Sequence, residues 1–542
     1  MAAALIRPGA AAPIFSKDIA PIIEKHCVHC HRPGGIGWPI DFTSYPAIRP
    51  WAKAIRQAVV QKYMPPWLAD PGKSLKFRND ARLSSQQIAT LTAWVDAGAP
   101  GRGSLTVPAS NGGWDHPQGR APDLVISMER ELRIPPSGDI PYLRLLVKLP
   151  EAEDRWISAV QARPGNASVV HHMAITEVGL DDGVLASDLE GFALLARQMG
   201  AAGPVSPMGP VVKTPGRGEM FDMLGIYTPG AALETYPGDT GKLLKGGRNK
   251  YLNFNIHYAS NGKPAADRSE VALWFRPTPP KEQIFRVPLA YDTILAEGVE
   301  LLTDAPGVKA EGTRAGIPPI PPGSANYELT AVTAFTRPVT IYQLHPHAHL
   351  RGKDFQYAAV FPDGREETLL SIPKYDFRWQ LAYELETPLA LPAGSKMVIT
   401  AHYDNSVNNR FNPAPEKQVY FRAQNQASDE MFSPFVQYSV ARSAADLPVV
   451  EVSGCLASAG QSSAWILSNL SLPVPSQQAA TSSARAPVQP GGGRQIELVG
   501  TRVFQPSKYE GQAVVVRGVV VDSRLSVTSL RPATPAIACS AN

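Results

Sequence analysis

The spacing of apolar residues changes near residue 100, and the two spacings predict different secondary structure. Between residues 14 and 100, apolar side chains recur every three or four positions, which is the repeat of an amphipathic helix. A capping-box sequence at Ser84–Gln87 marks the start of another such stretch. We therefore expect residues 14–100 to form a small all-α domain. The clearest helical stripe consists of Phe15, Ile19, Ile22 and Ile23.

Residues 121–445 show the two-residue alternation of half-buried β-strands instead. Examples are Trp156–Gln161 and Tyr251–Tyr258, and turns rich in Pro and Gly separate such runs. This pattern is typical of β-sandwiches and barrels. Because the segment is too long for one sandwich, we expect two all-β domains, at residues 121–285 and 286–445.

The last segment, residues 446–542, is also rich in predicted strands. Its strongest strand signal is Val514–Val521. A stretch rich in Ser, Ala, Pro and Gly at residues 471–493 is expected to be a flexible loop. We expect this segment to form a small β-barrel-like (OB-like) module with a role in interaction or docking.

The overall composition narrows the functional classes. The chain has 542 residues with a formal net charge of +4 and no basic stripe, so nothing favours nucleic-acid binding. No run reaches the roughly 18 apolar residues that a membrane helix needs. Charged residues are few (18%) and prolines are many (52), which is typical of secreted β-rich proteins. Ala10–Pro13 resembles the end of a secretory signal, so we expect a periplasmic or secreted protein with a truncated signal.

The chain has four cysteines, and two of them, Cys455 and Cys539, lie in the last segment. In an oxidising compartment they would form a disulfide that contributes roughly 4 kcal/mol. Two unpaired buried thiols are the alternative, and the sequence leaves both open.

Nine of the eleven histidines fall into four short groups, unlike histidines scattered through a core. Because imidazole is the commonest metal ligand, this clustering indicates metal sites. The groups are His26, His29 and His31; His171 and His172; His257; and His345, His347 and His349.

The first group lies in the C-x-x-C-H sequence from Cys27 to His31. In c-type haem attachment, the thiols of Cys27 and Cys30 bind the haem and His31 ligates the iron. Met64 is the candidate sixth ligand, with an ordinary core methionine as the alternative. A redox C-x-x-C pair or half of a zinc site would explain the cysteines differently. The helical segment resembles a class I c-type cytochrome, which implies one covalently bound haem c.

The last group indicates a second kind of metal site. On a strand, His347 and His349 would point to the same face and could chelate one metal. Downstream, Met431 offers a thioether, a soft ligand that favours Cu(I). This combination suits neither zinc nor magnesium, and it therefore predicts copper.

The two remaining groups together predict a site of three imidazoles. His171 and His172 are adjacent, so both can bind one metal only where their strand bulges. His257 lies in a separate predicted strand and would supply the third ligand. Three imidazoles would hold a copper ion that cycles between Cu(I) and Cu(II).

These motifs resemble those of the copper type II, ascorbate-dependent monooxygenases, the family of peptidylglycine α-hydroxylating and dopamine β-monooxygenases. The resemblance implies two jelly-roll sandwiches that each hold one copper and face each other across a cleft. It assigns His171, His172 and His257 to one copper, and His347, His349 and Met431 to the other. The matching stretches are 163–166, 169–173, 256–258, 347–352 and 429–431.

The chain departs from this family in two respects. Residues 121–445 contain no cysteine, whereas the animal enzymes carry several disulfides there. His345 also offers an alternative chelate with His347, but the pair of His347 and His349 fits the family motif better. His116 and His402 fall outside all motifs and are expected to be structural.

The resemblance implies hydroxylation of a substrate C–H bond with O2 at the copper of His347, His349 and Met431. Ascorbate or another reductant would supply electrons, which the haem could relay from a periplasmic donor. The expected partners are a small-molecule or peptide substrate, O2 and the donor, with no nucleic acid and no membrane span. A periplasmic electron-transfer cytochrome and a copper-binding protein without turnover are the alternatives.

Overall fold

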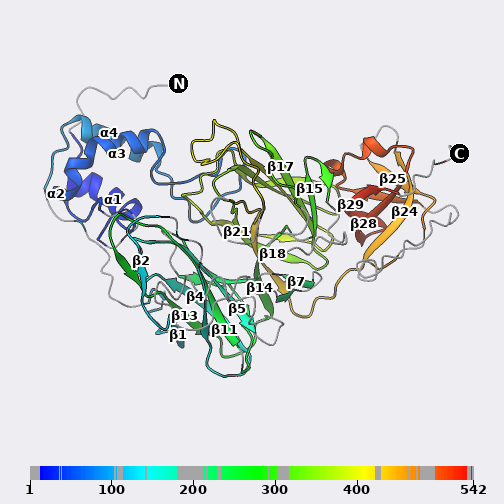
Figure 1. Ribbon diagram of the computed structural model, residues 1–542, viewed down its shortest axis with the longest axis horizontal. Coiled ribbons are helices and arrows are strands. Elements are labelled where there is room, and N and C mark those ends of the chain that lie inside the picture. The colour runs from blue at the N-terminus through cyan, green and yellow to red at the C-terminus, as the bar shows by residue number, and fades with distance from the viewer. Residues whose placement is uncertain are drawn as a thin grey trace.

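The computed structural model describes residues 12–539, apart from 106–113, 180–211, 302–316, 422–428, 476–494, 534–538 and shorter gaps of one to four residues. Two expectations lie partly outside the described residues: the signal-like end at Ala10–Pro13 and most of the loop 471–493. Figure 1 shows short helices at one end of the molecule, a broad β-rich body, and a small group of C-terminal strands at the opposite end.

Short helices form the N-terminal part, because apolar residues at helical spacing meet in one small core. Phe15 and Ile19 pack there with Leu91 and Trp94, and all four are buried. The capping box at Ser84 is complete, as the sequence predicts. The elements are η1 (Phe15–Ile19), α1 (Ala20–His26), α2 (Tyr45–Ile48), η2 (Arg49–Trp51), α3 (Ala52–Val60) and α4 (Ser85–Asp96).

The prediction of an all-α cytochrome c domain at residues 14–100 is wrong. Its helices are short, and α4 is the longest of those described, with 12 residues. Between α3 and α4 the chain leaves the helices and runs along the second half of the β-rich body, which consists of residues 286–445. There the N–H of Asp70 donates to the carbonyl of Ser371 (2.8 Å), and the ring of Trp67 lies 4.9 Å from that of Tyr383. This stretch is extended because its apolar side chains are buried by a β-sheet core instead of by neighbouring helices.

A nine-stranded sheet connects the two halves of the β-rich body. Its strand β14 (Glu282–Pro288) crosses the boundary expected at residue 285 and pairs with strands from both halves. Ile284, Phe285 and Val287 in β14 are buried, so this near-continuous apolar run needs neighbours on both sides. The sheet order is β1 (Leu124–Ser127), β13 (Glu270–Phe275), β4 (Arg155–Arg163), β10 (Thr240–Leu244), β14, β23 (Phe435–Ala441), β18 (Val339–His345) and β21 (Tyr383–Leu391), with β9 (Glu234–Thr235) beside β4.

The predicted fold class, with two separate jelly-roll sandwiches after an α domain, is therefore wrong. The body consists of one sheet shared by both halves and of smaller sheets that belong to one half each. In the first half these are β3 (Leu143–Lys148), β11 (Lys250–Tyr258), β5 (Val170–Gly179) and β8 (Met223–Tyr227); β12 (Ala265–Asp267) with β2 (Leu132–Ile134); and β6 (Val212–Thr214) with β7 (Gly218–Met220). In the second half the order is β16 (Val299–Glu300), β15 (Thr293–Ala296), β17 (Tyr327–Ala334), β22 (Lys396–Tyr403), β19 (Gly352–Val360) and β20 (Glu366–Ile372).

The C-terminal strands close into a five-stranded barrel, because β24 pairs with both β25 and β28. Lys396 of β22 attaches the barrel to the body: its Nζ donates to the carbonyls of Val499 (3.0 Å) and Gly500 (2.8 Å). The elements are β24 (Val449–Ser458), β25 (Trp465–Ser468), β26 (Val474–Pro475), β27 (Gln495–Val499), η5 (Arg502–Phe504), η6 (Pro506–Tyr509), β28 (Ala513–Val521) and β29 (Arg524–Pro532).

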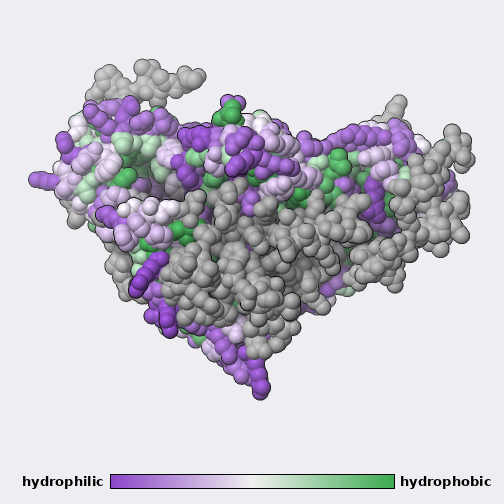
Figure 2. All heavy atoms as spheres, viewed as in Figure 1, coloured by the Kyte–Doolittle hydropathy of each residue, from purple (hydrophilic) through white to green (hydrophobic). Residues whose placement is uncertain are grey.

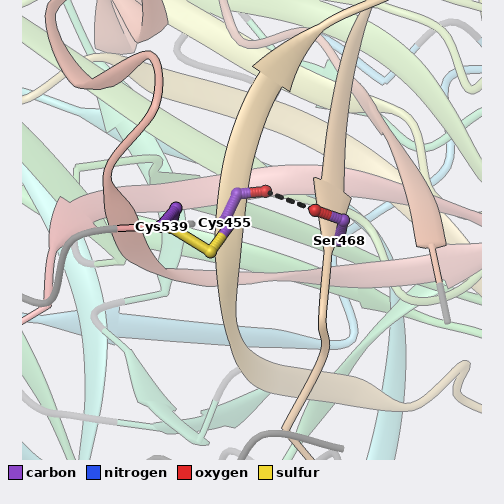
Figure 3. Close-up of a disulfide and its surroundings, with 3 residues drawn as sticks. All are labelled: Cys455, Ser468 and Cys539. Carbon is purple, nitrogen blue, oxygen red and sulfur yellow. Dashed lines mark hydrogen bonds between the residues drawn. A yellow bond between two sulfur atoms is a disulfide. The ribbon is translucent and has the colours of Figure 1, made fainter. Parts of the chain in front are cut away.

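Cys455 and Cys539 form a disulfide that ties the end of the chain to β24 (Figure 3). The hydroxyl of Ser468 donates to the carbonyl of Cys455 on the neighbouring strand (3.3 Å). Of the two alternatives that the sequence leaves open for these cysteines, the structure therefore has the disulfide.

Hydrophilic residues dominate the coloured surface in Figure 2, and hydrophobic residues form only small groups on it. Among the described residues, no helix has the length and apolar character needed to cross a membrane.

Candidate metal centre

Two neighbouring strands bring His171, His172 and His257 together. β5 and β11 pair in antiparallel register, with His172 opposite His257. The register then shifts so that Tyr258 lies opposite Val170, which makes His171 an extra residue in β5. This β-bulge is the irregularity that allows two adjacent histidines to face the same partner.

The three imidazoles have the geometry of a metal site. One ring nitrogen from each residue lies within 4.8 Å of the others. Nδ1 of His171 is 3.1 Å from Nδ1 of His172. Two imidazole nitrogens at this distance share either a hydrogen-bond proton or a cation, so the arrangement is compatible with a bound metal ion.

Burial keeps these imidazoles neutral. Desolvation lowers the pKa of His171, His172 and His257, and nearby imidazoles lower the pKa of the latter two further. A hydrogen bond from the His171 ring to the backbone of Arg378 raises the pKa of His171 in part. Neutral imidazole is the form that ligates metals, so the protonation state matches the proposed role.

His347 and His349 lie in the connection between β18 and β19, and not on a strand, because Pro346 ends the ladder of β18. Their ring centroids are nevertheless only 5.4 Å apart. Nδ1 of His347 donates to Oε1 of Gln380 (2.6 Å), and Nδ1 of His349 donates to the carbonyl of Asp429 (2.9 Å). Both hydrogen bonds use Nδ1, so Nε2 is the nitrogen of each ring that would ligate a metal ion.

Met431 belongs to the same group, because its sulfur lies 3.4 Å from Nε2 of His347. The neighbouring Glu430 is fully buried and accepts hydrogen bonds from the backbone N–H of His349 (2.8 Å) and of Arg351 (2.6 Å). Burial raises the pKa of Glu430 to about 7, although these hydrogen bonds oppose the shift. The carboxyl group holds the histidine connection against the methionine segment.

The two sets of candidate ligands lie against each other. The ring centroid of His172 is 6.0 Å from that of His347, although the resemblance implies an open cleft between the sets. The ring of Phe377 contacts imidazoles of both sets, at centroid distances of 5.6 Å for His171, 6.1 Å for His257 and 5.8 Å for His349. The five imidazoles and the thioether thus form one contiguous cluster, which we call the histidine cluster.

The segment Tyr375–Gln380, between β20 and β21, contributes three contacts that no motif in the sequence predicts. Phe377 and Gln380 touch imidazoles, and the hydroxyl of Tyr375 bonds both the N–H (3.2 Å) and the carbonyl (3.0 Å) of Ala348. None of these three residues is a usual metal ligand. The only signal in the sequence is the local density of aromatic residues.

The other histidines lie outside the histidine cluster. His345 ends β18 and packs against Phe435 (5.7 Å), so the alternative chelate with His347 is not formed. Each of the two unassigned histidines has a partner elsewhere: His402 contacts Asp354 and Glu328, and His116 packs against Trp274.

The predicted haem residues lie at the end of α1. Cys27 and Cys30 form no disulfide, and burial raises the pKa of their thiols to about 12 and about 11, so both are protonated. Desolvation lowers the pKa of His31, whose ring packs against Phe42 (4.6 Å). Two neutral thiols and a neutral imidazole on one turn are the chemical groups that covalent haem attachment uses. Met64 lies in the loop after α3, and its role as a ligand stays a prediction.

Comparison with known proteins leaves the family of this chain open. No protein-family model matches it, and no curated protein matches it. Among solved structures, the major capsid protein P2 of bacteriophage PM2 aligns with 59% of this chain and 99% of its own, at 13% identity and a TM-score of 0.19. The infectious bursal disease virus VP2 subviral particle aligns with 59% of this chain and 72% of its own, at 9% identity and a TM-score of 0.14. Likenesses this weak carry no argument about fold or function.

Proposed function

We propose that the protein is a copper-dependent monooxygenase of the copper type II class, which hydroxylates a C–H bond of an organic substrate. The observation that carries this proposal is the pairing of two unlike donor sets in one partly buried cluster. A thioether with two imidazoles favours Cu(I), whereas three imidazoles accommodate both oxidation states. Copper storage alone would not need this division.

Bound copper would supply one-electron chemistry with O2, so that one oxygen atom enters the C–H bond and the other leaves as water at the cost of two electrons and two protons. The residues of the chain prepare the site for this chemistry. Gln380 and the carbonyl of Asp429 orient the rings of His347 and His349. Phe377 covers imidazoles of both sets, which limits the access of water.

We also propose covalent haem at Cys27 and Cys30, as a source of electrons next to ascorbate or another reductant. The loop after α3 approaches the histidine cluster through Arg378, whose guanidinium lies 5.7 Å from the ring of Tyr63 and whose backbone bonds His171. A pyridine haemochrome spectrum of the purified protein tests the attachment. Absence of the haem band would remove the relay and leave the copper proposal standing.

Copper analysis combined with oxygen uptake separates the proposed function from its alternatives. The proposal requires about two copper ions per chain and O2 consumption that depends on an added C–H substrate, with peptides and small aromatic amines as first probes. Two copper ions without substrate-dependent uptake would favour copper binding without turnover. A haem protein that binds no copper would favour electron transfer alone. The disulfide supports a periplasmic or secreted location for any of these functions.

A further inference from the structure

One short segment supports both ligand sets, although it supplies no metal ligand. Tyr375–Gln380 connects β20 to β21 in the second half, yet Phe377 and the backbone of Arg378 contact His171 of the first half. Its own turn is well held, because Asp376 accepts from the N–H of Arg378 (3.0 Å) and also pairs with its guanidinium. The segment can therefore act as a fixed support for the imidazoles.

Gln380 makes the most specific contact of this segment. Its side chain and that of His347 are both buried, at 3% and 8% exposure, so water cannot replace their 2.6 Å hydrogen bond. The amide oxygen accepts only, which places the proton of His347 on Nδ1. The amide nitrogen of Gln380 in turn donates to the carbonyl of Phe377 (3.4 Å), which fixes the orientation of the amide. The remaining nitrogen of His347, Nε2, then faces Met431.

We propose that Gln380 is a positioning residue that fixes the tautomer and ring orientation of His347 and, as a neutral acceptor, favours Cu(I) at the site of His347, His349 and Met431. This inference rests on the proposed copper function. The oxygen of a neutral amide is a weaker hydrogen-bond acceptor than a carboxylate, so it attracts the Nδ1 proton of His347 less strongly. The imidazole of His347 therefore remains a weaker electron donor to the metal, and Cu(I), the ion of lower charge, is favoured. The thioether of Met431 acts in the same direction.

Two substitutions at this position test the proposal against a matched control. Gln380→Leu removes the acceptor, and Gln380→Glu keeps an acceptor but adds charge. Gln356→Leu, at an exposed glutamine that bonds Thr368, is the control. The full chain of each variant is first checked for its fold by the melting temperature of the metal-free protein. Cu(I) affinity is then measured with a competing chromophoric chelator, and the copper potentials by redox titration.

We expect Gln380→Leu to weaken the binding of one of the two Cu(I) ions about 10- to 100-fold, with a smaller effect on the other. Gln380→Glu should retain both copper ions but lower the potential of one of them, which a purely structural role for Gln380 would not do. The control should match the wild type in every measurement. If the wild type binds two copper ions and either Gln380 variant behaves like it, the inference is overturned and the proposed function survives. If the wild type does not bind two copper ions, both are overturned.

Discussion

The imidazole ring of His172 lies 6.0 Å from that of His347, although 174 residues separate the two in the chain. The first belongs to the three-imidazole set and the second to the set that includes a thioether. Direct contact between the sets means that a substitution in one half of the β-rich body can alter the site in the other half. The ring of Phe377 makes a second connection, because it lies 5.6 Å from that of His171 and 5.8 Å from that of His349.

Glu430 is expected to be essential for the shape of the second ligand set. Glu430→Ala leaves the backbone N–H groups of His349 and Arg351 buried without their acceptor. We expect the free energy of unfolding of the metal-free protein to fall by about 3 kcal/mol, measured by chemical denaturation. Glu416→Ala, at an exposed position, is the control. Equal stability of the two variants would show that the carboxylate of Glu430 does not hold the histidine connection.

His402 is expected to stabilise the fold in a pH-dependent way. Its ring lies 2.7 Å from Asp354 and 3.4 Å from Glu328, and the hydrogen bond to Asp354 is the main cause that raises its pKa. A raised pKa in the folded state gives stability that is complete below pH 6.5 and is lost as the pH rises through the folded-state pKa. The difference in melting temperature between the wild type and His402→Gln should therefore be larger at pH 5.5 than at pH 9. A difference that does not change with pH would contradict this assignment.

Lys396 should hold the C-terminal barrel to the body. Its buried Nζ donates to the carbonyls of Val499, Gly500 and Val527. Lys396→Met keeps most of the side-chain volume but removes the donor, so we expect a loss of about 3 kcal/mol in the free energy of unfolding. Lys374→Met, at an exposed site, should change little. If the two variants have the same free energy of unfolding, attachment of the C-terminal barrel to the body does not depend on this contact.

The disulfide between Cys455 and Cys539 should contribute to stability through the 84 residues that it spans. In the chain-entropy model, a loop of this length corresponds to about 4 kcal/mol. The double variant Cys455→Ser/Cys539→Ser should unfold at lower denaturant concentration than the wild type, and a reductant should shift the wild type but not the variant. A wild type that is insensitive to the reductant would refute the prediction.

Local patterns were sufficient to predict individual elements. The capping box at Ser84 and the strand signal at Val514–Val521 correspond to α4 and β28, because caps and side-chain periodicity depend on neighbouring residues. Each of these two features is decided by a few consecutive residues. The adjacent pair of His171 and His172 sets only a condition, that both can bind one metal where their strand bulges, and β5 has such a bulge.

Long-range pairing could not be predicted in this way. β14 pairs with β10 in parallel and with β23 in antiparallel orientation. The pattern of apolar and polar residues in β14 does not determine either orientation. Trp67 lies within the predicted all-α domain, yet it is half-buried and packs against Tyr383 of the β-rich body. Gln380 belongs to no ligand motif, and only its position beside His347 gives it a role.

Copper K-edge absorption of the Cu(I)-loaded protein, with copper counted in the same sample, tests the central claim most directly. Two unlike donor sets predict two copper ions per chain, one of which has a sulfur neighbour. Met431→Leu should remove that sulfur signal, whereas the control Met397→Leu, in the buried core, should retain it. A protein that binds no copper, or a sulfur signal that survives Met431→Leu, would contradict the account.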